Sequence, residues 1–175
     1  TGSDKQTYYK LTLSGGDPDS VREMADTLFA GRCVDGDIAL CEAALSTQCF
    51  LKLVELGVPF PRNRYGEYIG YKTDHDPRRR ATSVGPYTSK QMTECLERAV
   101  QAKGVPMLDK TQVIKILTDG GTVCGLLCLN VAAQDAADRF TLIRCKNVVY
   151  ATGGPAGMYA DSVYPFSQYG ATGLA

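Results

Sequence analysis

The feature that most constrains the fold is a change of hydrophobic period near Gly104. Before this glycine, apolar residues recur every three or four positions, as they do on one face of an α-helix. After it, they form short runs rich in Val, Ile and Leu, which are typical of β-strands. The sequence therefore predicts a helical first part followed by a β-rich part.

Two helices are predicted between residues 17 and 57. Asp17-Pro18-Asp19 supplies a capping acid and an early proline for a helix that ends near Ala30. The second helix follows Asp35-Gly36-Asp37, has about 20 residues and ends at Gly57. Its expected buried face carries the apolar residues Ile38, Cys41, Leu45, Cys49, Leu53 and Leu56.

A third helix and several strands complete the predicted elements. Thr88 or Ser89 caps a helix from Lys90 to Lys103, with Gly104 after it. Residues 8–13 read as a strand before the helices, and the later runs are 105–108, 112–117, 123–131, 140–144 and 147–150. The pair Gly120-Gly121 separates two of these runs, so we expect a hairpin there.

Length and charge limit the classes of function. The chain has 175 residues; residues 1–3 read as a tag remnant, and residues 4–175 are expected to form a single domain. Nineteen basic residues balance nineteen acidic ones, which argues against a nucleic-acid partner and a polybasic membrane anchor. No run of about 18 apolar residues occurs, so direct membrane insertion is not expected.

The seven cysteines are expected to be reduced, buried and not bound to metal. They are Cys33, Cys41, Cys49, Cys95, Cys124, Cys128 and Cys145. No C-x-x-C pair occurs and His75 is the only histidine, so no metal site is predicted. Reduced thiols favour a reducing compartment such as the cytoplasm.

Residues 62–80 form a polar, basic stretch that is predicted to be a loop. It contains six arginines and lysines and three acidic residues, which gives a net charge of +3. The stretch is either a solvated basic loop or a contact for an anionic ligand. His75 is expected to be a solvated loop residue.

The segment 147–157 is predicted to be a buried strand that runs into a glycine loop. Gly153 and Gly154 have no Cβ atoms, so their backbone can approach a flat or phosphorylated ligand closely. The segment does not fit the dinucleotide fingerprint G-x-G-x-x-G, because Thr152 and Pro155 break the pattern. Read alone, these glycines fit a plain turn equally well.

The order of several short motifs resembles one flavoprotein family. The motifs are Asp26-Thr27, Gly31, Asp35, the helix that ends in Leu56-Gly57-Val58-Pro59-Phe60-Pro61-Arg62, Arg80 with Thr88-Ser89, Gln112-Val113 up to Gly121, Val123-x-Gly125, and Val148 to Gly154. They are similar to segments of the flavoprotein subunits of fumarate reductase, succinate dehydrogenase and L-aspartate oxidase. The last motif resembles the family's VVLATGG.

The resemblance implies a middle piece of an FAD-dependent oxidoreductase. The expected fold class is α/β, or α+β for the isolated piece, as a fragment of an FAD/NAD(P)-binding-type flavoprotein domain. Its parent reaction would be hydride transfer between the flavin and a carbon–carbon bond beside a carboxylate or carbonyl of a small-molecule substrate. The implied cofactor-binding residues are Gln112, Val113, Ala151, Thr152, Gly153 and Gly154, with Arg80, Ser89, Thr172 and Gly173 near the flavin. Arg80 fits a surface salt bridge equally well.

Departures from the family limit what the chain can do alone. No G-x-G-x-x-G occurs in it, Thr172 stands where the family has an aspartate, and Ser89 replaces a glycine. No catalytic residue is expected, because the resemblance places the substrate-binding residues in remaining domains of the parent chain. We therefore expect the isolated chain to carry no FAD. The alternative is a non-catalytic ligand-binding or protein-interaction module, whose basic loop docks a partner.

Overall fold

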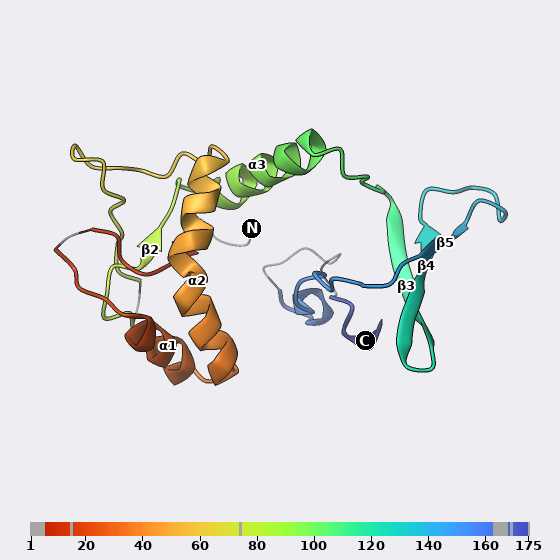
Figure 1. Cartoon of the computed structure of the whole chain (residues 1–175), viewed down its shortest axis with the longest axis horizontal. Helices are drawn as coiled ribbons and strands as arrows, with labels where there is room; N and C mark the ends of the chain where they lie inside the picture. Colours follow the sequence, from red (N-terminus) through yellow and green to blue (C-terminus); the bar gives the residue numbers. More distant parts are fainter. Residues whose placement is uncertain (1–5, 15, 74, 163–167, 169, 175) are drawn as a thin grey trace. The chain divides into compact units, whose positions relative to one another are not determined.

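The structure, a computed structural model, describes residues 6–14, 16–73, 75–162, 168 and 170–174. Its contacts divide the chain into two compact units, Thr1–Val105 and Pro106–Ala175 (Figure 1). The first contains the three α-helices and the second contains the main β-sheet, so the predicted order of a helical part and a β-rich part is confirmed. A single domain over residues 4–175 stays a prediction.

The first unit is built on three helices and one short pair of strands. Its elements are β1 (Tyr8–Tyr9), α1 (Val21–Ala30), α2 (Gly36–Glu55), β2 (Ala81–Thr82) and α3 (Thr88–Ala102). β1 and β2 are antiparallel, with Tyr8 opposite Thr82 and Tyr9 opposite Ala81. The strand expected over residues 8–13 is therefore confined to its first two residues.

The helix starts follow from local capping chemistry. Asp35 caps α2 as predicted, since its carboxylate accepts hydrogen bonds from the N–H groups of Asp37 and Ile38 at 3.0 Å. α1 begins later than predicted, because Ser20 is its N-cap and accepts from the Glu23 N–H at 3.1 Å. The N-cap residue of α3, Tyr87, makes no capping hydrogen bond with its side chain. The predicted cap Thr88 instead donates to the Gly85 carbonyl and accepts from the Val84 N–H.

The buried face of α2 differs from the predicted one. Ala39, Ala43, Ser46, Phe50 and Leu53 are buried, whereas Ile38, Cys41, Leu45 and Cys49 are exposed. α2 carries two apolar stripes, and the packing uses the one with the small residues. Ala43 lies against Met24 and Ala25 of α1, because a small side chain lets the two helices approach closely.

An aromatic cluster forms the main core of the first unit. The Phe50 ring lies 4.7 Å from that of Phe60 and 4.9 Å from that of Tyr68, between ring centroids. Cys95 of α3 is buried in the same cluster. Edge-on and tilted contacts of this kind stabilise a core beyond the area that they bury. The cluster therefore holds α2, the segment after it and α3 together.

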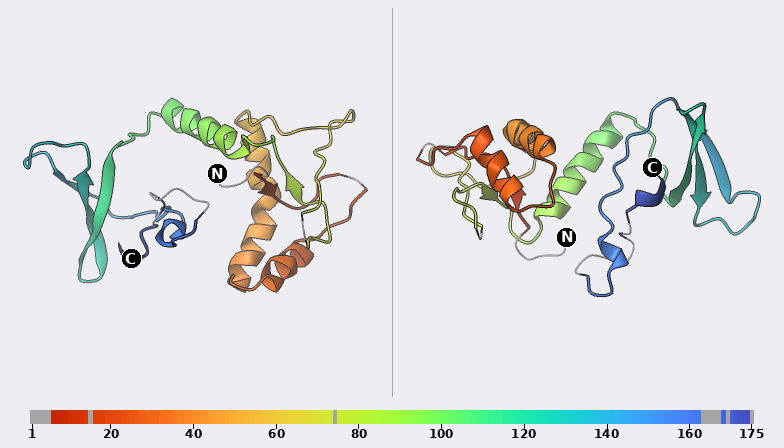
Figure 2. Two further views of the ribbon diagram at one scale, coloured as in Figure 1. Left: turned by 180° about the vertical axis from the view of Figure 1, so that it is seen from behind. Right: turned by 90° about the horizontal axis from the view of Figure 1, so that it is seen from below.

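The second unit contains an antiparallel sheet in the order β3-β4-β5 (Figure 2). Its strands are β3 (Thr111–Asp119), β4 (Thr122–Asn130) and β5 (Phe140–Arg144). Gly120 and Gly121 have φ angles of 55° and 81°, which glycine adopts readily, and they form the predicted hairpin turn. The short helices η1 (Ala156–Met158) and η2 (Thr172–Leu174) follow the sheet.

Two of the predicted strands do not form. Residues 105–108 and 147–150 pair with no strand in the described part of the chain. The Val149 side chain is 91% exposed, so the predicted buried strand at 147–150 is wrong for this structure. The physical reason is that an apolar run becomes a buried strand only where neighbouring strands accept its backbone hydrogen bonds.

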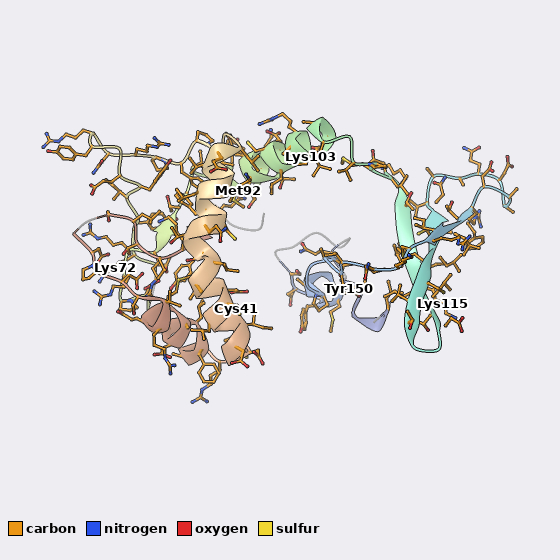
Figure 3. The ribbon with its side chains drawn as sticks, viewed as in Figure 1. Cys41, Lys72, Met92, Lys103, Lys115 and Tyr150 are labelled. Atoms are coloured by element: carbon orange, nitrogen blue, oxygen red, sulfur yellow. The ribbon has the colours of Figure 1, made fainter. Side chains whose placement is uncertain are left out.

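The prediction that the cysteines are buried is largely wrong. Cys95 and Cys128 are buried, but Cys33, Cys41, Cys49 and Cys124 are exposed and Cys145 is intermediate. All seven are free thiols. Cys41, labelled in Figure 3, and Cys49 are exposed because they lie on the unused stripe of α2. None of the helices described is both long and apolar enough to cross a membrane.

Gly125 allows a close approach of β4 and β5, which gives a first testable prediction. A Cβ atom at this position would lie 2.6 Å from the carbonyl oxygen of Ile143, a backbone atom that cannot rotate away. Gly125→Ala should therefore lower the free energy of unfolding of the sheet by about 2–3 kcal/mol. Urea unfolding followed by circular dichroism measures the change. Unaltered stability would show that the two strands can separate at no cost.

Candidate functional site

The glycine loop at residues 151–154 is open and exposed. Ala151, Thr152, Gly153 and Gly154 are all exposed. Among the residues that the structure describes, their N–H and carbonyl groups form no hydrogen bond. Gly153 has a φ of 72°, and a Cβ on Gly154 would meet no atom within 4 Å. The loop therefore presents free backbone groups with no side-chain bulk in front of Gly154.

A second segment braces this loop. The Gly157 N–H donates to the Gln168 carbonyl at 2.7 Å. A Cβ on Gly170 would lie 3.2 Å from the Gly153 oxygen and from the Pro155 nitrogen, so the two backbones are in contact. Sequence reasoning missed the roles of Gln168 and Gly170, because a single glycine in a polar stretch does not reveal which segment it contacts.

The other predicted residues of the second unit lie on β3 and η2. Gln112 and Val113 are on β3, opposite Leu129 and Cys128 of β4. Thr172 and Gly173 are in η2, which contacts β3. Eight of the ten predicted residues therefore belong to the same unit as the glycine loop.

Arg80, in the first unit, is the centre of a buried ion network and not a surface salt bridge. Its side chain is 0% exposed and donates to both carboxylate oxygens of Asp19, at 2.7 and 2.9 Å. It also donates to Asp76 at 3.2 Å, to the Thr27 hydroxyl at 2.9 Å and to the Tyr9 hydroxyl at 3.3 Å. These bonds tie together β1, the segment just before α1, α1 itself and the loop before β2.

The other predicted residue of the first unit, Ser89, is half-buried near the start of α3. Its backbone N–H donates to the side-chain oxygen of Gln6 at 2.9 Å. The basic loop around Arg80 is irregular, as predicted, and His75 is exposed in it with a φ of 68°. Arg78 of this loop is paired with Glu23 at 2.7 Å.

The network shifts the proton affinities of its members. Burial raises the pKa of Asp19, but hydrogen bonds from Arg80 and from the N–H groups of Thr12 and Ser20 outweigh it and hold that pKa below its usual value. Burial lowers the pKa of Arg80, but its hydrogen bonds to Asp19 and Tyr9 raise that pKa by more. The net effect is a pKa above the usual value of arginine. Burial raises the pKa of Tyr9 to about 12. Arg80 and Asp19 therefore stay charged, as a structural pair does.

Lys10 is a second buried cation, with fewer partners. Its side chain is fully buried, its Nζ lies 4.7 Å above the centre of the Phe50 ring, and it donates to the Leu11 carbonyl at 3.3 Å. Burial lowers the pKa of Lys10 to about 8, although Asp19 raises it. Folding therefore holds this ammonium group in a site that disfavours its charge.

The Lys10 shift gives a pH prediction with a definite sign. The unfolded lysine has a pKa of about 10.4, so between about pH 8 and pH 10 the unfolded state binds more protons, and Lys10 makes stability rise with pH. Lys10→Met should raise the free energy of unfolding at pH 7. The excess of the variant's free energy of unfolding over that of the original chain should then shrink by about 1 kcal/mol from pH 8 to pH 9.5. Urea titrations of both proteins measure this difference, because the contributions of the titratable groups that the two proteins share cancel in it. A difference independent of pH would contradict the prediction.

The chemistry available at the glycine loop is binding and not proton transfer. Residues 151–154 contain one hydroxyl, that of Thr152, and no acid or base. Free N–H groups beside a surface without Cβ atoms suit a planar or phosphorylated ligand. FAD has both properties, so the residues present fit this cofactor.

Comparison with known proteins agrees with this chemistry. The sequence model of the FAD binding domain family matches residues 8–173. L-aspartate oxidase of Mesorhizobium japonicum is 28% identical over 164 residues, which are 91% of this chain and 31% of that protein. L-aspartate oxidase of Agrobacterium fabrum is 27% identical over 159 residues, 89% of this chain and 29% of that protein. The chain thus spans about a third of the length of these curated relatives.

Solved structures show the same fold. A quinol fumarate reductase FrdA mutant of E. coli superposes with a TM-score of 0.73 at 22% identity, over 89% of this chain and 26% of that chain. Sdh1 of Mycobacterium smegmatis in complex with UQ1 gives 0.72 at 16% identity, over 90% of this chain and 29% of that chain. The expected fold of a flavoprotein domain is confirmed. With its match over residues 8–173, the chain belongs to the FAD binding domain family.

Proposed function

We propose that this chain is a cofactor-holding part of a longer FAD-dependent oxidoreductase. The observation that carries the proposal is the open glycine loop, whose backbone N–H and carbonyl groups are free among the described residues. The loop lies within the region that matches the FAD binding domain family. Ala151, Thr152, Gly153 and Gly154 would line the FAD through their backbone, and Gln112 and Val113 would approach its adenine end. Thr172 and Gly173 would lie near the flavin.

Bound FAD would supply the redox chemistry, transfer of a hydride to or from a carbon–carbon bond beside a carboxylate or carbonyl. The residues of this chain would bind and orient the cofactor. Ser89 and Arg80 are proposed near the flavin side, and the buried network of Arg80 would act there by keeping the first unit rigid. The substrate-binding groups would come from remaining domains of the longer protein.

The substrate class, a small carboxylate or carbonyl compound, rests on the resemblance to fumarate reductase and L-aspartate oxidase. The test is to reduce the longer flavoprotein without oxygen and then to add an α,β-unsaturated dicarboxylate. Return of the oxidised flavin spectrum, with one saturated product per flavin, would support the proposal. A spectrum that stays reduced would contradict this substrate class. The alternative of a non-catalytic module has no support among the similar proteins.

A further prediction concerns the 175-residue chain by itself. It contains no G-x-G-x-x-G, the motif that holds a dinucleotide pyrophosphate at a helix N-terminus. The few backbone groups of residues 151–154 do not offset the cost of immobilising a large flexible ligand. The chain should therefore purify without FAD and bind added FAD weakly. An FAD absorption band at near-stoichiometric occupancy after gel filtration would contradict this.

A further inference from the structure

We propose that the outer edge of β5 is an interaction surface for a second copy of this chain. The two β5 strands would pair antiparallel about Leu142, so that one continuous sheet crosses the two copies. The proposal concerns a part of the second unit that the proposed FAD contacts do not use.

The backbone of β5 is open on one side. β5 is an edge strand, and in the part of the chain that the structure describes no strand pairs with its outer side. The Asn130 N–H donates to the Arg139 carbonyl at 2.8 Å, and the Cys145 N–H donates to the Cys124 carbonyl at 3.3 Å. The odd-numbered residues therefore bond to β4. Because alternate residues of an antiparallel strand direct their backbone groups to opposite sides, those of Phe140, Leu142 and Arg144 point outward.

The two edges of the sheet differ in their protection against pairing. β3 carries Lys115 at its centre (Figure 3) and has register irregularities between Val113 and Lys115 and between Leu117 and Thr118. Charged residues and bulges are the usual devices that keep an edge strand single. The central residues 141–143 of β5 are uncharged, contain no proline and keep a regular register. The β5 edge is therefore the one that accepts another strand.

The side chains at this edge are apolar and exposed. Phe140 is 56% exposed and Leu142 is 69% exposed. They lie opposite Leu129 and Leu127 of β4, so the four side chains share one face of the sheet. A second copy at the edge would extend this row and remove part of it from water.

The sequence of β5 is complementary to itself about Leu142. Pairing there sets each Leu142 opposite its own copy and each Phe140 opposite Arg144 of the other copy, which suits a cation–π contact. The same register brings Asp138, in the turn just before β5, toward Lys146, which lies just after β5 in the other copy, at both ends. These two charged residues are exposed and form no ion pair in the part of the chain described. The outward backbone groups of residues 140, 142 and 144 meet in this register, so hydrogen bonding and charge favour the same alignment.

Sedimentation velocity of the 175-residue chain under reducing conditions tests the proposal, at concentrations from about 1 μM to about 100 μM. We expect a monomer that converts to a dimer as concentration rises. Leu142→Lys sets two like charges on the symmetry axis and should raise the dissociation constant at least about tenfold. Val131→Lys is the matched control, because Val131 is also an exposed apolar residue but lies outside β5. It should leave the dissociation constant unchanged.

A charge exchange tests the register and does not depend on the fold of the lysine variant. Asp138→Lys and Lys146→Asp should each weaken the dimer, and the double variant should restore it. A chain that stays monomeric would overturn the proposal, as would a charge exchange without effect. A dimer that survives Leu142→Lys but is lost in Leu45→Lys would also overturn it. That result would assign the contact to the apolar groove of about 790 Å³ beside α1 and α2, which Leu45 lines.

Discussion

Replacement of Arg80 by methionine will lower the free energy of unfolding of the first unit by about 3–5 kcal/mol, because it leaves buried carboxylates without their cation. Asp19 and Asp76 both have side chains that are 3% exposed, so water does not replace the lost partner. Arg80 donates a hydrogen bond to one carboxylate oxygen of Asp76. The other oxygen is buried and accepts no hydrogen bond from the residues described. Urea unfolding followed by circular dichroism measures the loss.

Arg22→Met is the matched control for this prediction. Arg22 also pairs with an aspartate, Asp26 at 3.0 Å, but both side chains are largely exposed. Exposed pairs of this kind contribute about 0.5 kcal/mol, so the control should be nearly as stable as the original chain. Equal effects of the two substitutions would show that the buried network does not stabilise the unit.

Gly154→Val in the longer flavoprotein should abolish retention of FAD. The structure leaves the space beside Gly154 empty, since a Cβ there meets no atom within 4 Å. A branched side chain therefore fits the protein itself but fills the surface that we propose for the cofactor. Flavin absorbance per mole of purified protein measures retention.

Gly16→Val is the control for the loop substitution. Gly16 is likewise a glycine without a positive φ, and a Cβ there also meets no atom within 4 Å. The control should keep its flavin, and both variants should unfold at the same urea concentration as the original protein. Full flavin content in Gly154→Val would refute the close approach of FAD to this residue.

Local signals in the sequence predict the elements better than their packing. Asp35 and the glycines at 120 and 121 act within a few residues, and both the start of α2 and the hairpin turn agree with the prediction. The predicted buried face of α2 is wrong except at Leu53, because the helix has two apolar stripes and distant segments decide between them. These segments are α1, which packs on Ala43, and the cluster that contains Phe60 and Cys95. The prediction that Cys41 and Cys49 are buried is wrong for the same reason, since both are exposed.

The site shows the same division between local and distant information. The glycines of the loop are visible in the sequence, but the contact of Gly170 with Gly153 depends on a segment that approaches from elsewhere. The sequence leaves Arg80 as a flavin neighbour or a surface residue, since its partners Asp19 and Thr27 are more than fifty positions away. Residues 147–150 have the composition of a strand but no partner strand among the described residues.

Hydrogen–deuterium exchange on the longer flavoprotein, with FAD and after its removal, tests the central claim most directly. If residues 151–154 and 112–113 contact FAD, the amides of Thr152, Gly153 and Gly154 should exchange more slowly in the FAD-bound protein, because no other group in the described structure bonds them. A peptide that covers residues 145–157 should show this protection, and one that covers 120–130 should not. Identical exchange of residues 151–154 with and without FAD would contradict the account.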